Sequence, residues 1–267
     1  MISLGLLRCA NELDYIEEIM EIHRKHFPII YFMDDSHDGT GDVVRSYKEV
    51  VCSTRTLELC NHKRHGIGQT SQIAIDQMLK AFKPPFWVTG LCADEIHWQC
   101  PLQVLQRAEY NGWSAVMWMP MHFFLHSSQR DTWDTEWRNR PLMEKLKWYC
   151  PGDTQVGWPG AEAKQFLVKE RVIFEYGDAD APAGVRARTN PPPYPFYLHC
   201  GYRNPEQAME RVKRSFDNQA NLDDRGLFAH GPFLDCLEGL SKPTYFTGDF
   251  GEYEIPDLYK TSECEHC

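Results

Sequence analysis

The sequence predicts an α/β fold, and two observations lead to this prediction. Short apolar runs alternate with segments whose apolar residues recur at helical spacing, and turn residues separate the two kinds of segment. Chains with this alternation build parallel βαβ units with right-handed crossovers. The 267 residues, 42% of them hydrophobic, are enough for one large domain or two small ones.

The first half of the chain repeats this unit. We expect strands at residues 2–7, 28–34, 49–56, 85–93 and 113–124, and helices at 15–27, from 41 onward, at 68–82 and at 101–112. Gly112 closes the last of these helices, and Trp118 and Phe123 are the plainest core residues. After residue 126 the regularity fades, until a proline-rich loop leads into a helix that begins near Asn204. We expect a nucleotide-binding half at 1–126 and a second half at 127–267 that completes the pocket.

The composition limits the classes of function. The net charge of −10 opposes non-specific attraction to polyanions, so a nucleic-acid scaffold would need a local basic groove. No apolar run is long enough to cross a membrane, and the first residues lack a secretory signal. We therefore expect a cytoplasmic protein whose ten scattered cysteines are mostly reduced.

Carboxylates come directly after two of the predicted strands. Asp34 and Asp35 follow the second strand and precede a glycine-rich turn, where they could accept hydrogen bonds from a ribose or a base. Asp94 and Glu95 follow the fourth strand, and oxygen ligands of this kind hold Mn²⁺ or Mg²⁺. A turn with a helix cap is the alternative at the first site, and a helix N-cap is the alternative for Asp94.

His199 ends the apolar stretch "PFYL" shortly before the last predicted helix. A neutral imidazole at this position could ligate the same metal ion. Arg203 or Lys213 would then lie near the phosphates of the ligand.

Together these residues resemble the GT-A glycosyltransferases, in particular the family-2-like enzymes. The resembling segments are the Asn-Glu loop of "RCANELDYI", the Asp-rich "DDSHDGT", the "CAD" of residues 92–94, and "HCGYRNPEQAMERVKR". The resemblance covers about residues 2–126 and 196–216. It implies a Rossmann-like mixed sheet flanked by helices, forming a single domain that binds a nucleotide-diphosphate sugar.

The resemblance also implies roles for individual residues. Asp34 or Asp35 would bind the nucleoside beside Asn11 and Glu12, while Asp94 and His199 would hold Mn²⁺ or Mg²⁺ on the diphosphate of a UDP-sugar. Further candidates for donor contacts are Lys63, Arg64, His65, Gln69 and Arg203. The sequence departs from the family pattern at Cys92, which stands where an acidic residue is usual.

An inverting transferase needs a general base near the acceptor hydroxyl. The sequence offers Asp131, Asp134 and Glu136 among tryptophans, and Glu162, which we expect to open a helix. The predicted function is therefore a metal-dependent glycosyltransferase acting on a hydroxyl acceptor.

Three alternatives stay open at this stage. A nucleotidyltransferase would need a glycine-rich phosphate loop, which the N-terminal segment lacks. A catalytically inactive nucleotide-sugar-binding protein would agree with Cys92. A viral-type DNA glycosyltransferase acting on hydroxymethylated bases would need a basic groove, for which the candidates are Arg130, Arg138, Arg140, Lys145 and Lys147.

Overall fold

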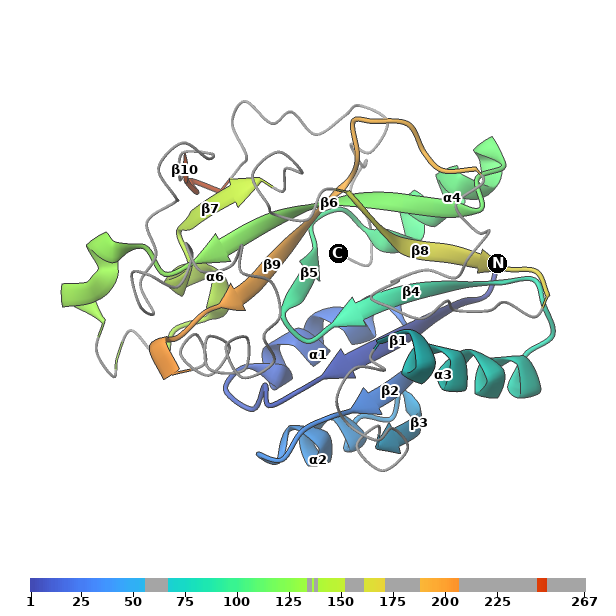
Figure 1. Ribbon diagram of the computed structural model, residues 1–267, viewed down its shortest axis with the longest axis horizontal. Coiled ribbons are helices and arrows are strands. Elements are labelled where there is room, and N and C mark those ends of the chain that lie inside the picture. Colours follow the sequence, from blue (N-terminus) through green and yellow to red (C-terminus); the bar gives the residue numbers. More distant parts are fainter. Residues whose placement is uncertain are drawn as a thin grey trace. The chain divides into compact units, whose positions relative to one another are not determined.

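The computed structural model describes residues 1–55, 67–133, 136, 139–151, 161–170, 188–206 and 244–248. These residues form two compact units (Figure 1). Unit 1 holds the described residues within 1–118 and 162–195, and unit 2 holds those within 119–161 and 196–255. Among the described residues, each unit is built from two stretches of sequence, because the chain leaves unit 1 in the middle of one long strand and later returns to it. The boundary that the sequence predicts at residue 126 stays a prediction.

Unit 1 contains most of the regular elements. In chain order they are β1 (Ser3–Cys9), α1 (Ile16–His26), β2 (Ile30–Asp34), α2 (Thr40–Arg45), β3 (Val50–Arg55), α3 (Ile67–Ala81), β4 (Phe86–Cys92), β5 (Glu95–His97), α4 (Pro101–Asn111), the first part of β6 (Ala115–Phe124) and β8 (Glu162–Val168). All the helices and strands expected before residue 126 are present.

The sheet of unit 1 has the strand order β3–β2–β1–β4–β8–β6. The first four strands in this order are parallel, and β8 runs antiparallel to both β4 and β6. The predicted fold class, a mixed α/β sheet flanked by helices, is confirmed. The order β3–β2–β1–β4 also matches the first four strands of the doubly wound order 3-2-1-4-5-6, in which ligands lie outside the carboxyl ends of the strands.

Helices cover both faces of this sheet because the strands are apolar on both faces. On one face, Leu4 and Leu6 of β1 belong to a cluster with Ile75 and Met78 of α3. On the other face, Leu7 belongs to a cluster with residues of α1 and α2. Successive side chains of a strand point to opposite faces, so one apolar strand anchors helices on both sides.

Helix α4 ends as the sequence predicts. Gly112 adopts the left-handed conformation at φ +68°, and its backbone N–H donates to the carbonyl of Ala108. A glycine tolerates this conformation at little cost, so it terminates the helix and turns the chain into β6. Trp118 and Phe123 of β6 are both fully buried, as expected of core residues.

Unit 2 contains the rest of β6, η2 (Ser127–Thr132), α6 (Leu142–Lys145), β7 (Trp148–Pro151), β9 (Phe196–Tyr202) and β10 (Thr244–Tyr245). Strand β6 pairs antiparallel with β7 and parallel with β9, and β10 extends the sheet beyond β7. The rings of Phe123, Tyr149 and Phe246 pack together and are buried. No helix within the described ranges is long and apolar enough to span a membrane.

One sequence-based prediction of local structure and one of the alternatives are wrong. Glu162 is the first residue of strand β8 rather than of a helix. The segment "EAKQFLV" pairs antiparallel with both β4 and β6 and lies between them in the sheet. Asp94 does not cap a helix, since the short strand β5 follows it and α4 begins only at Pro101, with Cys100 as its N-cap. The helix expected from Asn204 onward lies largely outside the described residues, so it stays a prediction.

Candidate functional site

The acidic ends of β2 and β4 lie on either side of the end of β1. In the parallel pairing, Cys9 of β1 is the register partner of Asp34, and Arg8 is the register partner of Cys92. The backbone N–H of Asp35 and that of Ala93 each donate to a carbonyl of β1, both at 3.0 Å. The carboxylates that follow β2 and β4 therefore share one edge of the unit 1 sheet, which we call the acidic edge.

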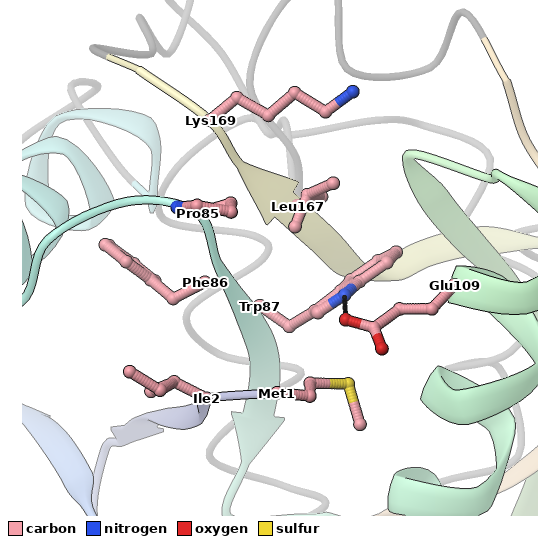
Figure 2. A pocket seen from close by; sticks show the side chains of 8 residues that line it. All are labelled: Met1, Ile2, Pro85, Phe86, Trp87, Glu109, Leu167 and Lys169. Carbon is pink, nitrogen blue, oxygen red and sulfur yellow. Dashed lines mark hydrogen bonds between the residues drawn. The ribbon is translucent and has the colours of Figure 1, made fainter.

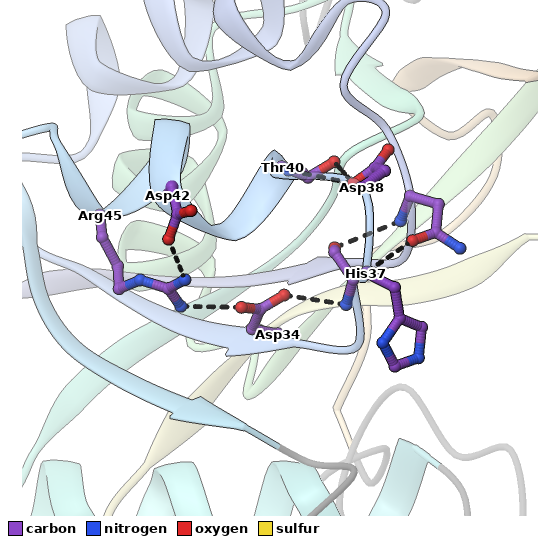
Figure 3. A network of polar contacts seen from close by, with 8 residues as sticks. Asp34, His37, Asp38, Thr40, Asp42 and Arg45 are labelled. Carbon is purple, nitrogen blue, oxygen red and sulfur yellow. Dashed lines mark hydrogen bonds and ion pairs between the residues drawn. The ribbon is translucent and has the colours of Figure 1, made fainter.

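Asp34 is fixed by its own loop (Figure 3). One carboxylate oxygen accepts from the backbone N–H of Ser36 at 2.9 Å, and the other pairs with the guanidinium of Arg45 at 2.7 Å. Its side chain is 1% exposed, whereas Asp35 beside it is exposed. Asp34 thus organises the loop, and Asp35 is the accessible carboxylate of the pair.

Two glycines allow this loop to close. Gly39 has φ +97°, a left-handed conformation that favours glycine. A Cβ atom at Gly41 would fall on the carboxylate of Asp34, so the ion pair with Arg45 requires a glycine there. The glycines of the turn after the second strand therefore allow helix α2 to pack close to Asp34.

The Asn-Glu loop after β1 is tied to the same turn. The side-chain oxygen of Asn11 accepts from the backbone N–H of His37 at 2.8 Å, and the N–H of Glu12 donates to the hydroxyl of Thr40 at 2.8 Å. Asn11 has a positive φ of 63°, and Glu12 is 5% exposed. Asn11, Glu12, Asp34 and Asp35 are therefore brought together, as the sequence predicts, but the first three are held by protein groups.

Asp38 caps the start of α2. Its carboxylate accepts from the backbone N–H and the hydroxyl of Thr40, at 3.0 and 2.6 Å, and from the N–H of Leu13 at 3.2 Å. Partial burial works to raise its pKa, but these hydrogen bonds together hold the pKa of Asp38 below its ordinary value. Asp38 thus lies just before the N-cap residue Gly39 and satisfies the backbone N–H of Thr40, the first residue of α2, in agreement with the alternative of a turn with a helix cap.

The end of β4 carries the cluster that best fits a cation. Ligand atoms of Cys92, Asp94 and Glu95 all lie within 4.8 Å of one another. Burial, and next the charge of Glu95, raise the pKa of Cys92 well above its usual value, so the thiol is neutral. Asp94 and Glu95 are 7% and 5% exposed and supply the hard oxygen donors that Mg²⁺ and Mn²⁺ prefer. The donor set fits such an ion through its two carboxylates.

Sequence reasoning missed Lys164, which lies beside this cluster. Its ammonium group pairs with Glu95 at 2.8 Å and with Glu162 at 2.7 Å, and its side chain is only 3% exposed. Glu95 is 69 residues away in sequence, so no local pattern relates the two. The one available signal was a lysine among the apolar residues of "EAKQFLV".

Two histidines, His23 and His97, lie next to residues of the cluster. Burial lowers the pKa of His23 to about 4, against a smaller opposing effect of its hydrogen bond with the backbone of Cys92. Burial, and next the proximity of His23, lower the pKa of His97 well below its usual value. The ring of His97 meets Trp118 edge-on at a centroid distance of 4.6 Å. Both imidazoles are neutral at pH 7, and they add no positive charge to the cluster.

The other predicted site residues are distributed as follows. His199 lies within β9 of unit 2 rather than at a strand end, and its Nδ1 is 2.9 Å from Nδ1 of its register partner His122. Arg203 is fully buried in unit 2, and Asp131 is exposed on η2. Asp134 and His65 lie outside the described residues, and for Gln69 only its place in α3 is described. The roles assigned to all these residues stay predictions.

A separate cavity of about 350 Å³ lies at the other edge of the unit 1 sheet (Figure 2). Its lining includes Ile2, Pro85 and Phe86 at the amino ends of β1 and β4, and the indole N–H of Trp87 donates to Glu109 at 3.3 Å. None of the predicted site residues lines it. The cavity is therefore distinct from the acidic edge.

The similarity of the chain to known proteins is distant. No family model and no curated protein matches the chain. Solved structures of TarS from S. aureus match with TM-scores of 0.33, 0.32 and 0.40 and identities of 18%, 17% and 14%. The second of these, of TarS 1-349, is a complex with UDP-GlcNAc.

The matches cover 48%, 46% and 83% of this chain and 22%, 34% and 66% of the matched chains, so the chain spans less than two thirds of their length. What the structure itself shows is the strand order β3–β2–β1–β4–β8–β6 in unit 1, with carboxylates at the ends of β2 and β4.

Proposed function

We propose that the protein is a metal-dependent glycosyltransferase that moves a sugar from a nucleotide-diphosphate sugar, most simply a UDP-sugar, to a hydroxyl acceptor. The observation that carries this proposal is the shared edge described above. Asp35 at the end of β2 and the Cys92–Asp94–Glu95 cluster at the end of β4 flank the same strand, β1. This is where open α/β sheets bind nucleotides.

The residues of this edge suit the two ends of a nucleotide diphosphate. Asp35 is exposed and can accept hydrogen bonds from a ribose or a base, while Asn11, Glu12 and Asp34 keep its loop in place. Asp94 and Glu95 would hold Mn²⁺ or Mg²⁺, and such an ion stabilises the charge that develops on a diphosphate leaving group. His199 as a further ligand and Arg203 as a phosphate contact remain parts of the proposal.

The general base is proposed from the same four candidates. Glu162 is 24% exposed and its carboxylate is held by Lys164, which gives it both access to solvent and a fixed position. Asp131 and Glu136 are exposed but lie in unit 2, and Asp134 lies outside the described residues. Of the four, Glu162 is therefore the first to test, by comparing turnover in Glu162→Gln with binding of the donor.

The alternative of a DNA glycosyltransferase gains no support from the described residues. Of the five basic residues that would form its groove, Lys145 is 3% exposed and Arg140 pairs with Glu136 at 3.5 Å. The alternative of a catalytically inactive nucleotide-sugar-binding protein agrees with the neutral thiol of Cys92. The experiment below separates this second alternative from a transferase.

The test is a screen of nucleotide sugars, starting with UDP-GlcNAc, for Mn²⁺-dependent release of the free nucleotide. We expect release by the wild-type protein and a loss of at least about 100-fold in Asp94→Ala, in the range found when a charge-stabilising group is removed. Asp76→Ala, in the middle of α3, is the control for the loss of a partly buried carboxylate outside the cluster, one that accepts from Gln72 at 3.0 Å. Equal turnover in Asp94→Ala and wild type would refute the metal assignment, and tight donor binding without release would favour the inactive binding protein.

A further inference from the structure

Lys164 is an unusual residue for the interior of a sheet. It stands on β8 between β4 and β6, and its ammonium group lies 2.8 Å from Oε1 of Glu95 and 2.7 Å from Oε2 of Glu162. With 3% of the side chain exposed, the charge has little access to water. A buried ammonium is tolerated only when carboxylates compensate it, so both ion pairs matter to the position of Lys164.

Glu95 belongs to two groups at once. It is one of the two carboxylates of the candidate cation cluster, and it is also a partner of Lys164. A divalent cation bound by Asp94 and Glu95 would lie close to the ammonium, and like charges at such distances repel strongly where water is excluded. The cation and Lys164 therefore compete for the same carboxylate.

Glu162 is a second carboxylate partner of Lys164, and it can keep the ammonium paired when a cation binds Glu95. It already accepts the ammonium at 2.7 Å and, being 24% exposed, it has more freedom than Glu95, which is 6% exposed. When a cation takes Glu95, the ammonium can stay compensated by Glu162 alone. Glu162 would thus favour cation binding without touching the ion.

We propose that Lys164 is a built-in counter-ion that competes with the divalent cation for Glu95, and that Glu162 receives Lys164 when the cation binds. Lys164 is then a positioning residue that sets the cation affinity of the acidic edge, and Glu162 raises that affinity through Lys164. This inference rests on the proposed function only in assuming that Asp94 and Glu95 bind a cation. A purely structural role for Lys164 would leave the cation affinity of the folded protein unchanged.

The experiment measures the dissociation constant for Mn²⁺ alone, by calorimetry and by electron paramagnetic resonance of the free ion, on wild type, Lys164→Met, Lys164→Arg and Glu162→Gln. We expect Lys164→Met to bind Mn²⁺ about 10- to 100-fold more tightly, because the repulsion by the ammonium is removed. The size of this change, though not its direction, is that of losses seen when groups that contact metal ligands are mutated. Glu162→Gln should bind about tenfold more weakly, because Lys164 then loses the charge of Glu162 and pairs more strongly with Glu95. Lys164→Arg keeps the charge and should stay within about threefold of wild type.

A double-mutant cycle separates this mechanism from a general effect of charge. In the Lys164→Met background, Glu162→Gln should change the Mn²⁺ affinity by less than about twofold, because the route through Lys164 is gone. An effect of Glu162→Gln that is equally large in both backgrounds would overturn the proposal. So would Lys164→Met and Glu162→Gln both binding Mn²⁺ as the wild type does.

Folding does not limit this test. Lys164→Met leaves Glu95 buried without its counter-ion and is the variant at risk, so thermal unfolding without metal is measured first. Glu162→Gln keeps the pair between Lys164 and Glu95, and its weaker Mn²⁺ binding decides the matter if Lys164→Met does not fold. Unchanged Mn²⁺ binding by folded Glu162→Gln would then overturn the proposal.

The outcome is distinguishable from that of the proposed function. If wild type binds no Mn²⁺ but Lys164→Met does, Lys164 is the competitor and the metal-dependent mechanism fails. If Lys164→Met and wild type both bind none, the counter-ion proposal is overturned. The nucleotide-release screen then decides the transferase activity on its own readout.

Discussion

Adjacent residues of the Asp-rich turn have opposite surroundings. Asp34 ends β2, is buried and pairs with Arg45, whereas Asp35 begins the loop and is exposed. The sequence predicts that carboxylates gather here, but it cannot tell which of two neighbouring aspartates faces the ligand. The answer depends on the ion pair between Arg45 and Asp34, which forms only when helix α2 packs against the end of β2.

This division of roles gives a prediction for two neighbouring substitutions. Asp35→Ala should raise the dissociation constant for UDP at least about tenfold, with an unchanged melting temperature, because it removes an accessible acceptor of hydrogen bonds. Asp34→Ala should lower the free energy of unfolding by about 2 kcal/mol, because the half-exposed Arg45 loses a buried partner. Titration calorimetry and urea unfolding measure the two effects. If the two variants exchange these phenotypes, the assignment is wrong.

His23 gives a prediction of pH dependence at the residue scale. Its pKa in the folded state, about 4, lies below the unfolded value of about 6.5, so the unfolded chain takes up the proton first as the pH falls. The stability that depends on neutral His23 is fully present above pH 6.5 and is lost progressively as the pH falls towards 4. The loss over this window should be about 3 kcal/mol.

Urea unfolding between pH 7 and 4, in the presence of a chelator, measures this loss. His23→Asn keeps a polar side chain but does not titrate, so its stability should fall less steeply with acidification than that of the wild type. Parallel curves for the two proteins over this window would contradict the assignment of His23 as a buried neutral histidine.

At the scale of elements, strands β1, β2 and β4 were predictable because each is a compact apolar run followed by turn residues. Strand β8 was not, since the seven residues from Glu162 to Val168 carry glutamate, lysine and glutamine and show no strict alternation. Its identity as a strand depends on pairing with β4 and β6, which no local pattern encodes. For the same reason the ion pairs of Lys164 were not foreseeable.

The junction between β2 and α2 gives a prediction at the element scale. Gly41→Ala should lower the free energy of unfolding by about 2 kcal/mol or more, because its Cβ would displace the carboxylate of Asp34 from Arg45. Gly90→Ala on β4 is the matched control, since its Cβ would make only ordinary contacts, with Lys164 O at 3.6 Å. Urea unfolding compares the two. Equal losses would show that the approach of α2 to Asp34 is not tight.

At the scale of the whole molecule, the acidic edge belongs entirely to unit 1, although its residues come from sequence positions as distant as Asn11 and Lys164. The convergence of Asp34 and Asp94 on one edge was predictable, because parallel strands with this order end side by side. The two halves predicted from the sequence stay a prediction, and no break in the apolar pattern of β6 marks the point between Trp118 and Met119 at which one unit ends and the other begins.

The central claim is that the carboxyl edge of unit 1 holds a divalent cation on a nucleotide diphosphate. Paramagnetic broadening of backbone amide signals by Mn²⁺, with and without UDP, tests this claim most directly. The account predicts that the amides of Asp35, Ala93 and Glu95 broaden first and that UDP strengthens the effect. Broadening instead of Ile2 and Trp87 at the opposite edge, or no selective broadening of any amide, would contradict it.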